Sequence, residues 1–269
     1  MRRRQFLAAL PLTGAFAGCI GGSDPVASTE SRVPSSTDEA SPNTATGTST
    51  SQETVAAVLR ASYRYVHNND AIGVETPTHA QFAFVRPPNG DEEHPPHEYA
   101  LELGGERVGP AGRADGFMSW TPGVESVYTD ERRSDALKFD VPAIRAENAA
   151  LTHGDRRWPL TDPVRDRLAA APDLRLESLD VPESVDRNER IELGVTVTNE
   201  GDRTGTYLGG FRRGGYPQDI DARVAPGETG SDHVTYERVE GEGSIPFVFT
   251  GHETSEHFSV TVGSGTESS

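Results

Sequence analysis

The sequence has very little of two residues that most proteins use freely. Its 269 residues include one cysteine, Cys19, and one lysine, Lys138, so nearly all of the 25 basic residues are arginine. A single thiol excludes an internal disulfide. Because Cys19 precedes every segment with a core-forming pattern, thiol catalysis, Cys-ligated zinc and a blue-copper centre are also excluded from the folded part. We therefore expect the fold to be stabilised by core burial alone.

Common catalytic and nucleotide-binding motifs are also lacking. The chain contains no G-x-S-x-G sequence, no P-loop and no Rossmann glycine pattern. It has no N-x-[ST] site either, so N-glycans are not expected. With 42 acidic residues, pairs of carboxylates are too common for a glycosidase-type pair to be assigned. We predict that the protein is not an enzyme and uses no cofactor, no metal and no catalytic residue.

No hydrophobic run is long enough to cross a membrane. The apolar stretch near the N-terminus has about eleven residues, whereas a spanning helix needs roughly 20. Its length fits the central segment of an export signal. Arg3, Arg4, Phe6 and Leu7 match the R-R-x-F-L pattern of twin-arginine (Tat) export signals. We predict a signal peptide over residues 1–18. The alternative is a buried N-terminal helix whose arginines are incidental.

The segment that follows indicates a lipid anchor and a tether. Residues 16–19, Phe-Ala-Gly-Cys, resemble a lipobox in which phenylalanine replaces the usual leucine. This resemblance implies that Cys19 carries a lipid and holds the mature chain on the extracellular face of the cell membrane. Residues 23–54 then contain 15 serines and threonines among 32 residues. Such a stretch buries too little apolar surface to offset its ordering entropy. We predict a disordered linker over residues 19–54, whose 32-residue Ser/Thr-rich part spans about 30 Å.

Negative charge dominates the chain. Asp and Glu number 42 against 25 Lys and Arg, a net charge of −17, and loss of the three arginines of the signal leaves −20. An acidic surface with almost no lysine resembles proteins of extreme halophiles, where concentrated salt screens the repulsion. An ordinary acidic secreted protein is the alternative. After residue 4 no basic cluster is longer than an arginine pair, which argues against nucleic acid as a partner.

The remaining chain predicts an all-β protein. After the linker, apolar and polar residues alternate, which is typical of half-buried antiparallel strands, and we expect a β-sandwich domain over residues 55–161. The segments that alternate are 55–65, 82–84, 99–103, 137–141 and 149–151. A short helix follows over residues 162–171, with Asp162 as N-cap and Val164 and Leu168 on one face. We expect this connecting segment, residues 162–172, to join two tandem domains.

The second domain shows the clearest alternation. Ile191, Leu193, Val195 and Val197 alternate strictly with polar residues or glycine, and six more candidates surround this strand. The six are residues 174–181, 206–211, 220–224, 234–236, 245–249 and 258–262. Seven short strands in about 90 residues are typical of an immunoglobulin-like sandwich. We assign it to residues 173–263, followed by a disordered tail over residues 264–269.

Two stretches carry a family resemblance. The second domain resembles the CARDB-type or NEW3-like immunoglobulin-like domains of archaeal and bacterial surface proteins. The stretches that carry this resemblance are VPESVDRNERIELGVTVTNEGDRTGTYLGGF and the VAPGET that follows it. The resemblance covers Leu174 to Val262 and implies a recognition or spacer domain without shared catalytic residues. The first domain is loosely similar to immunoglobulin-like domains of the DUF4352 group, through the stretches QFAFV, YALELGGERV and ALKFDVPA. The whole chain resembles Tat-exported lipoproteins of haloarchaea.

Three segments contain residue types that could bind a metal ion. His94, His97 and Glu98, beside the acidic residues 91–93, offer two imidazoles and a carboxylate for a metal, but a solvated loop is favoured. The other histidines, which include His153, keep no ligand spacing. Residues 199–202 and 219–221 could ligate calcium, although a hairpin turn and an acidic strand face are favoured.

One surface segment stands out by composition. Phe211, Arg212, Arg213 and Tyr216 are flanked by glycines and predict a binding edge, because arginine and aromatic residues are favoured at interfaces. A bulge or loop marked by the glycines is the alternative.

Together these features favour a non-catalytic, lipid-anchored surface protein. Its tandem domains would recognise a cell-surface protein or glycan, or act as a spacer. The alternative is a solute-binding or accessory lipoprotein of a membrane transport or assembly complex. In that case the ligand would lie in a cleft between the helix over residues 162–171 and the two sandwiches.

Overall fold

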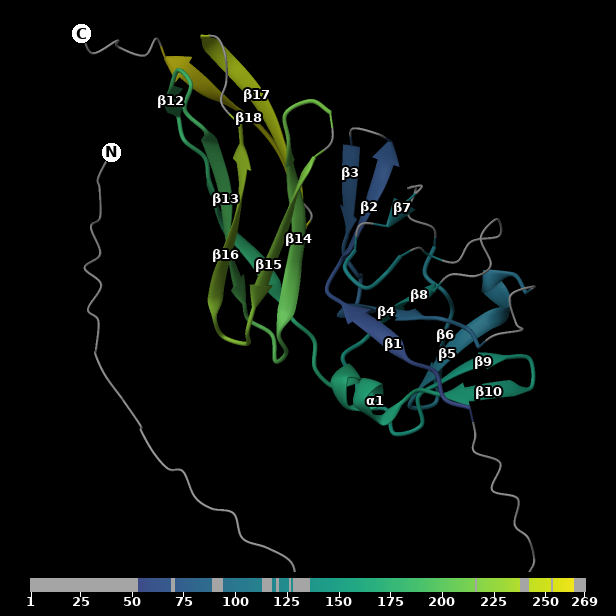
Figure 1. Cartoon of the computed structure of the whole chain (residues 1–269). Helices are drawn as coiled ribbons and strands as arrows, with labels where there is room; N and C mark the ends of the chain where they lie inside the picture. The colour runs from purple at the N-terminus through teal and green to yellow at the C-terminus, as the bar shows by residue number, and fades with distance from the viewer. Residues whose placement is uncertain are drawn as a thin grey trace, which may run out of the picture. The chain divides into compact units, whose positions relative to one another are not determined.

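The structure of the protein is a computed structural model. The structure describes residues 53–68, 71–88, 94–112, 118–119, 121–125, 127, 136–215, 217–237, 242–252 and 254–263. Within these ranges there are eighteen strands, one α-helix and one 3₁₀ helix, so the prediction of an all-β protein is confirmed (Figure 1). Thr50–Ser269 forms one compact unit. The predicted signal peptide, nearly all of the linker and the tail lie outside the described residues. Among those residues no helix is long and apolar enough to span a bilayer.

The first domain is built from three small antiparallel sheets. One sheet has the order β1 (Ala57–Arg60), β4 (Gln81–Val85), β8 (Leu137–Val141). A second has the order β10 (Arg156–Pro159), β9 (Ala150–His153), β5 (Tyr99–Leu103), β6 (Glu106–Val108), and η1 (Pro96–Glu98) leads into β5. The third has the order β3 (Ala71–Glu75), β2 (Tyr63–Asn68), β7 (Met118–Ser119). The sandwich expected over residues 55–161 therefore contains three sheets.

Strand β4 is the centre of this domain because it is buried on both faces. Ala83 and Val85 face the core shared with β5 and β9, whereas Phe82 and Phe84 pack on the other side with Tyr63. The period-two pattern of QFAFV therefore indicates the strand correctly, although neither face is exposed.

The single lysine lies in the interior of this domain. Lys138 on β8 is 1% exposed, and its Nζ is 2.6 and 2.5 Å from the two carboxylate oxygens of Glu75 on β3. The ammonium also lies 5.0 Å from the ring centroid of Phe82. Burial lowers the pKa of Lys138, and the Glu75 carboxylate opposes that shift. Because the single lysine is buried, every Lys or Arg charge on the described surface belongs to an arginine.

The prediction of one continuous alternating segment over residues 55–65 was wrong. The segment breaks at Ala61 and Ser62 into β1 and β2, which belong to different sheets. Ser62 and Arg64, expected to face solvent, are 0% and 1% exposed. They are buried because this side of β2 packs against the second domain, a contact that the local pattern does not encode.

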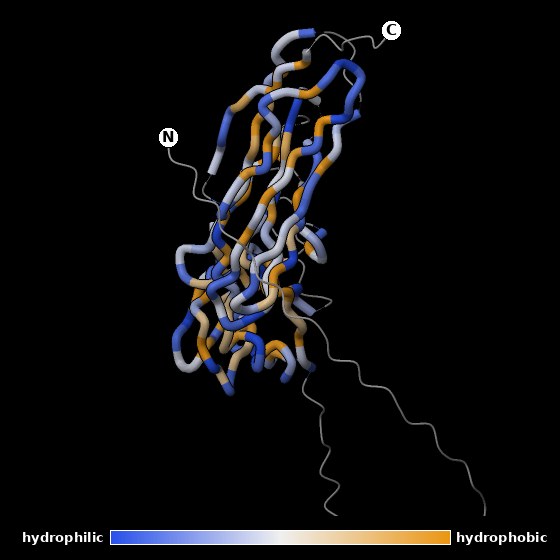
Figure 2. Tube along the Cα trace, turned by 90° about the vertical axis from the view of Figure 1, so that its left-hand side faces the viewer, coloured by the Kyte–Doolittle hydropathy of each residue, from blue (hydrophilic) through white to orange (hydrophobic). Residues whose placement is uncertain are grey.

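The second domain is a two-sheet sandwich that packs as an immunoglobulin-like domain does. One sheet has the order β11 (Leu174–Asp180), β13 (Ile191–Asn199), β16 (Thr229–Tyr236). The other has the order β12 (Ser184–Asp186), β18 (Thr254–Gly263), β17 (Gly243–Gly251), β14 (Gly205–Arg212), β15 (Gln218–Val224). All seven predicted strands are present, and β12 is an addition that pairs in parallel with β18. Hydrophobic and hydrophilic residues alternate along the long strands of this domain in Figure 2.

The helix between the domains is shorter than predicted. α1 spans Asp162–Leu168, so it ends three residues before the predicted end at residue 171, and Thr161, not Asp162, is its N-cap. Val164 and Leu168 are buried as predicted, and they join the core of the first domain. The residues after Leu168 lead directly into β11, and Pro172 is itself buried where the two domains meet.

Candidate functional site

A hollow lined by arginines lies between the first and second domains. Its walls come from β1 and α1 on one side, and from the loop between β13 and β14 and strand β15 on the other. It has a volume of about 440 Å³, which is in the range of small-molecule sites. Its basic lining residues are Arg60, Arg167, Arg203 and Arg223. Among the described residues, no aspartate or glutamate lines it. This set of residues is called the arginine cleft below.

Two of these arginines are held by neutral acceptors. The guanidinium of Arg60, at the end of β1, donates to the carbonyl oxygen of Pro122 at 3.0 and 2.6 Å. The guanidinium of Arg203, in the β13–β14 loop, donates to the carbonyl of Ala170 at 3.0 Å and to Gln81 Oε1 at 2.6 Å. Carbonyl and amide oxygens fix the geometry of the two groups without neutralising their charge.

Burial and neighbouring arginines disfavour the charges of Arg60 and Arg203. Burial, followed by Arg167 and Arg60, lowers the pKa of Arg203 to about 10, and burial with Arg167 also lowers the pKa of Arg60. Arg167 and Arg223 are exposed, and within the described ranges no cleft arginine forms an ion pair with a carboxylate. Unneutralised positive charge of this density is notable in a chain of net charge −17. An anion placed between the guanidinium groups would relieve the repulsion.

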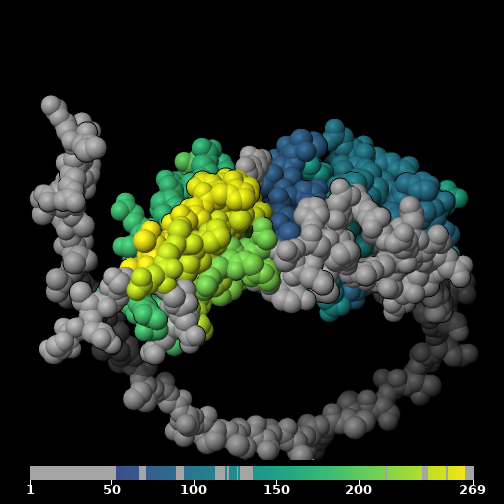
Figure 3. All heavy atoms as spheres, turned by 90° about the horizontal axis from the view of Figure 1, so that it is seen from above, coloured from purple at the N-terminus to yellow at the C-terminus, as the bar shows by residue number. Residues whose placement is uncertain are grey.

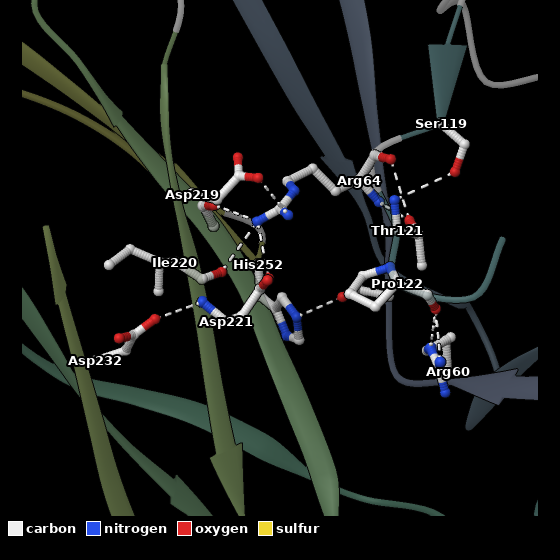
Figure 4. A network of polar contacts seen from close by, with 12 residues as sticks. Arg60, Arg64, Ser119, Thr121, Pro122, Asp219, Ile220, Asp221, Asp232 and His252 are labelled. Atoms are coloured by element: carbon white, nitrogen blue, oxygen red, sulfur yellow. Dashed lines mark hydrogen bonds and ion pairs between the residues drawn. The ribbon is translucent and has the colours of Figure 1, made fainter. Parts of the chain in front are cut away.

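A buried polar junction joins the two domains beside this cleft (Figure 4). Arg64 of β2 reaches into the second domain, where its Nη1 donates to the carbonyls of Gly209 and Ile220 at 2.9 and 3.1 Å. The same guanidinium pairs with Asp219 and Asp221 of β15, each at 3.0 Å. Burial, and next Asp221, raise the pKa of Asp219, and Arg64 opposes that shift. In Figure 3, blue atoms of the first domain lie next to green and yellow atoms of the second domain.

A histidine completes this junction. Nε2 of His252, in the β17–β18 turn, lies 2.7 Å from the Ser62 hydroxyl, and the imidazole stacks on Tyr207 with ring centroids 4.2 Å apart. Burial lowers the pKa of His252 to about 4. The junction therefore keeps this histidine neutral near pH 7, and its protonation opposes the packed state.

One of the four residues of the predicted binding edge lies in the interior of the second domain. Phe211 was assigned to it, but Phe211 is 0% exposed and packs in the core of the second domain, because alternation along β14 turns it inward. Arg212 and Arg213 are half-buried, and Tyr216 lies outside the described residues. A Cβ on Gly210 would lie 2.6 Å from Cδ1 of Ile72 on β3. Gly210 therefore permits close approach of Ile72 from the first domain.

The side chains of Asn199, Asp219 and Asp221, considered above as calcium ligands, are bonded to other groups of the protein. Oδ1 of Asn199 accepts from the backbone N–H groups of Asp173 and Gly201, and its Nδ2 donates to two carbonyls, so residues 199–202 form a fixed turn as favoured. Asp219 and Asp221 are paired with Arg64.

The histidine-rich segment differs from the sequence interpretation. His97 is exposed, residues 91–93 lie outside the described part, and the histidine that joins His94 and Glu98 is His153 of β9. His153, by its hydrogen bond, lowers the pKa of Glu98. Spacing in the sequence did not indicate His153, because strand pairing between β5 and β9 brings it there.

The arginines of the cleft were also missed. They come from four segments separated by up to 163 positions, and no local pattern connects them. The cleft nevertheless lies where the solute-binding alternative placed a ligand, beside the helix after residue 161 and between the two domains.

No protein family matches the chain, and no curated protein matches it. Among solved structures, the CARDB domain of the PF1109 protein from Pyrococcus furiosus, in complex with di-metal ions, is 20% identical over 34% of this chain and 89% of its own, with a TM-score of 0.28. A beta-glucosidase from Listeria innocua, in complex with isofagomine, is 17% identical with a TM-score of 0.26, and EmGH1, a glucosidase from Erythrobacter marinus, is 14% identical with a TM-score of 0.29. The matches cover 35% and 34% of this chain and 16% of each glucosidase. Scores this low transfer no activity or ligand, so the fold rests on the strand pairings, and the chain is similar to CARDB domains over about a third of its length.

Proposed function

We propose that the protein is a non-catalytic, lipid-anchored surface protein that binds an anionic ligand in the arginine cleft. The ligand class is a carboxylate-, sulfate- or phosphate-bearing solute, or an acidic glycan that presents the same groups. The observation that carries this proposal is the set of four arginines without a carboxylate partner among the described residues. Guanidinium groups bind such oxyanions through paired hydrogen bonds, which keep their strength when salt screens longer-range attraction.

The proposal combines the two functions considered from the sequence. Recognition by a surface protein requires a site, and the position of the arginine cleft beside α1 supports the solute-binding alternative. The buried junction at Arg64 supports a fixed position of the first domain relative to the second. The two sides of the arginine cleft are then preorganised, which lowers the entropy cost of binding. If the cleft binds nothing, the spacer function is what remains.

Anion titration tests the cleft. We expect calorimetry in concentrated NaCl to detect sulfate, citrate or glucuronate binding at one site, and Arg167→Gln with Arg223→Gln to weaken it at least tenfold. These two side chains are exposed, so their loss should not unfold the protein. Glucuronate binding would favour an acidic glycan, and binding of sulfate or citrate alone would favour a small solute.

The matched control changes the same net charge elsewhere. Arg187→Gln with Arg190→Gln removes two exposed arginines from the β12–β13 connection and should leave the affinity unchanged. Equal weakening by both double variants would show only a general charge effect and would refute the cleft as the site. Absence of binding across the panel would refute it as well.

The anchor is a separate part of the proposal. The Arg3-Arg4 motif and the position of Cys19 support export through the Tat route followed by lipid attachment. Intact-mass measurement of the protein from cell membranes should give a chain that begins at a lipid-modified Cys19. An unmodified thiol in that fraction would contradict the anchor, whatever the result for the cleft.

A further inference from the structure

A cluster of three potential metal ligands lies on the first domain, apart from the arginine cleft. His94 precedes η1, Glu98 ends η1, and His153 ends β9 in the neighbouring strand pair. Tyr99 follows Glu98 directly and pairs in register with His153 across β5 and β9. Three residues separated by up to 59 positions are therefore brought together by one strand pairing.

The donor atoms of this cluster have the spacing of a coordination sphere. His153 Nε2 lies 3.0 Å and His94 Nδ1 lies 3.5 Å from the same oxygen, Oε2 of Glu98. All three donor atoms lie within 4.8 Å of one another. Bond lengths to zinc of about 2.0–2.2 Å place two ligand atoms of one tetrahedral ion about 3.4 Å apart. The printed separations of 3.0 and 3.5 Å lie close to this spacing.

The supporting structure holds the three side chains in place. Pro95 and Pro96 restrict the backbone between His94 and Glu98, and η1 begins at Pro96. Gly154, with φ of 55°, allows the tight turn after His153. The ring of His153 packs between those of His94 and Tyr99, with centroid distances of 3.9 and 4.9 Å. A site preformed in this way loses little entropy on binding an ion.

We propose that His94, Glu98 and His153 form a binding site for a divalent transition metal of the zinc type, with solvent completing the coordination. Two imidazoles and one carboxylate suit Zn²⁺, Co²⁺ and Ni²⁺, whereas Ca²⁺ and Mg²⁺ require a shell of oxygen ligands. The side chains of His94 and Glu98 are 38% and 43% exposed, so an ion can enter from solvent. Bound metal would tie η1 to the β9–β10 hairpin and stabilise this edge of the domain.

Metal titration of the untagged full chain tests the site. We expect one Co²⁺ per chain with the visible absorption of a low-coordinate nitrogen and oxygen site, displaced by Zn²⁺. Zn²⁺ should also raise the Tm by a few degrees, because a ligand bound to the native state stabilises it. Calcium and magnesium should produce neither effect.

Variants separate this site from general histidine binding. Glu98→Gln and His153→Ala should each weaken Zn²⁺ binding at least tenfold and abolish the shift in Tm. His97→Ala removes the adjacent exposed histidine and should change the affinity less than twofold. Weakening by His97→Ala equal to that by His153→Ala would overturn the proposal, and so would wild-type protein without stoichiometric binding. Glu98→Gln covers the case in which His153→Ala fails to fold, and none of these outcomes depends on the arginine cleft.

Discussion

Replacement of Arg64 by alanine should lower the free energy of unfolding by about 3 kcal/mol. The substitution removes the guanidinium that pairs with Asp219 and Asp221 and leaves the carbonyls of Gly209 and Ile220 without that donor. Buried acceptors that lose their donor have a high desolvation cost. The two aspartates would also repel each other without the cation between them. All four of these partners belong to the second domain. The lost stability should therefore come from weaker packing between the two domains.

Chemical denaturation in concentrated salt measures this effect. Arg175→Ala is the matched control, because Arg175 also pairs with two carboxylates, Asp173 and Glu200, but its side chain is 60% exposed. Exposed ion pairs contribute little and are screened by salt, so this variant should remain close to wild type. Similar unfolding curves for Arg64→Ala and Arg175→Ala would mean that the Arg64 contacts do not stabilise the folded state.

Acidification should destabilise the same junction through His252. Its pKa is about 4 in the folded protein against an ordinary value of 6.5, so above pH 6.5 both states are neutral at this site and the stability is complete. As the pH falls from 6.5 to 4, His252 becomes protonated in the unfolded chain but stays largely neutral in the folded chain. This difference lowers the free energy of unfolding by about 3 kcal/mol at the end of that range.

A comparison of pH profiles isolates this contribution from the carboxylates that also titrate. His252→Gln keeps an amide near Ser62 but removes the titration, so its stability should decline less between pH 6.5 and 4 than that of wild type. His233→Gln alters an exposed histidine on β16 and should retain the wild-type slope. Parallel profiles for His252→Gln and wild type would contradict the role assigned to His252.

The second domain could be predicted well from its sequence. Residues of β13 alternate because one face covers a single core and the other faces solvent, so burial follows the local period of two. The turns between strands carry glycine and asparagine, which locate the strand ends. β12 was missed because it has three residues and a single half-buried valine, Val185, which is too little for a pattern.

The first domain could be predicted only in part. β1 and β2 read as one strand because the break at Ala61 and Ser62 lacks a glycine or proline to mark it. Arg64 and Lys138 are polar residues at buried positions, and each is stabilised by acidic partners distant in the sequence. Hydrophobic periodicity assigns such residues to the surface, so their burial could not be predicted from the sequence.

The sequence by itself determined the all-β class, the strands of the second domain and the two buried residues of α1. Those features depend on neighbours within a few positions, and the alternation of apolar residues records them directly. Only the tertiary structure decided that Phe211 is a core residue, that four dispersed arginines line one cleft, and that His153 lies beside His94 and Glu98. Each of these depends on which strands pair and which faces pack, and strand pairing brings together residues whose distance along the chain carries no information about their distance in space.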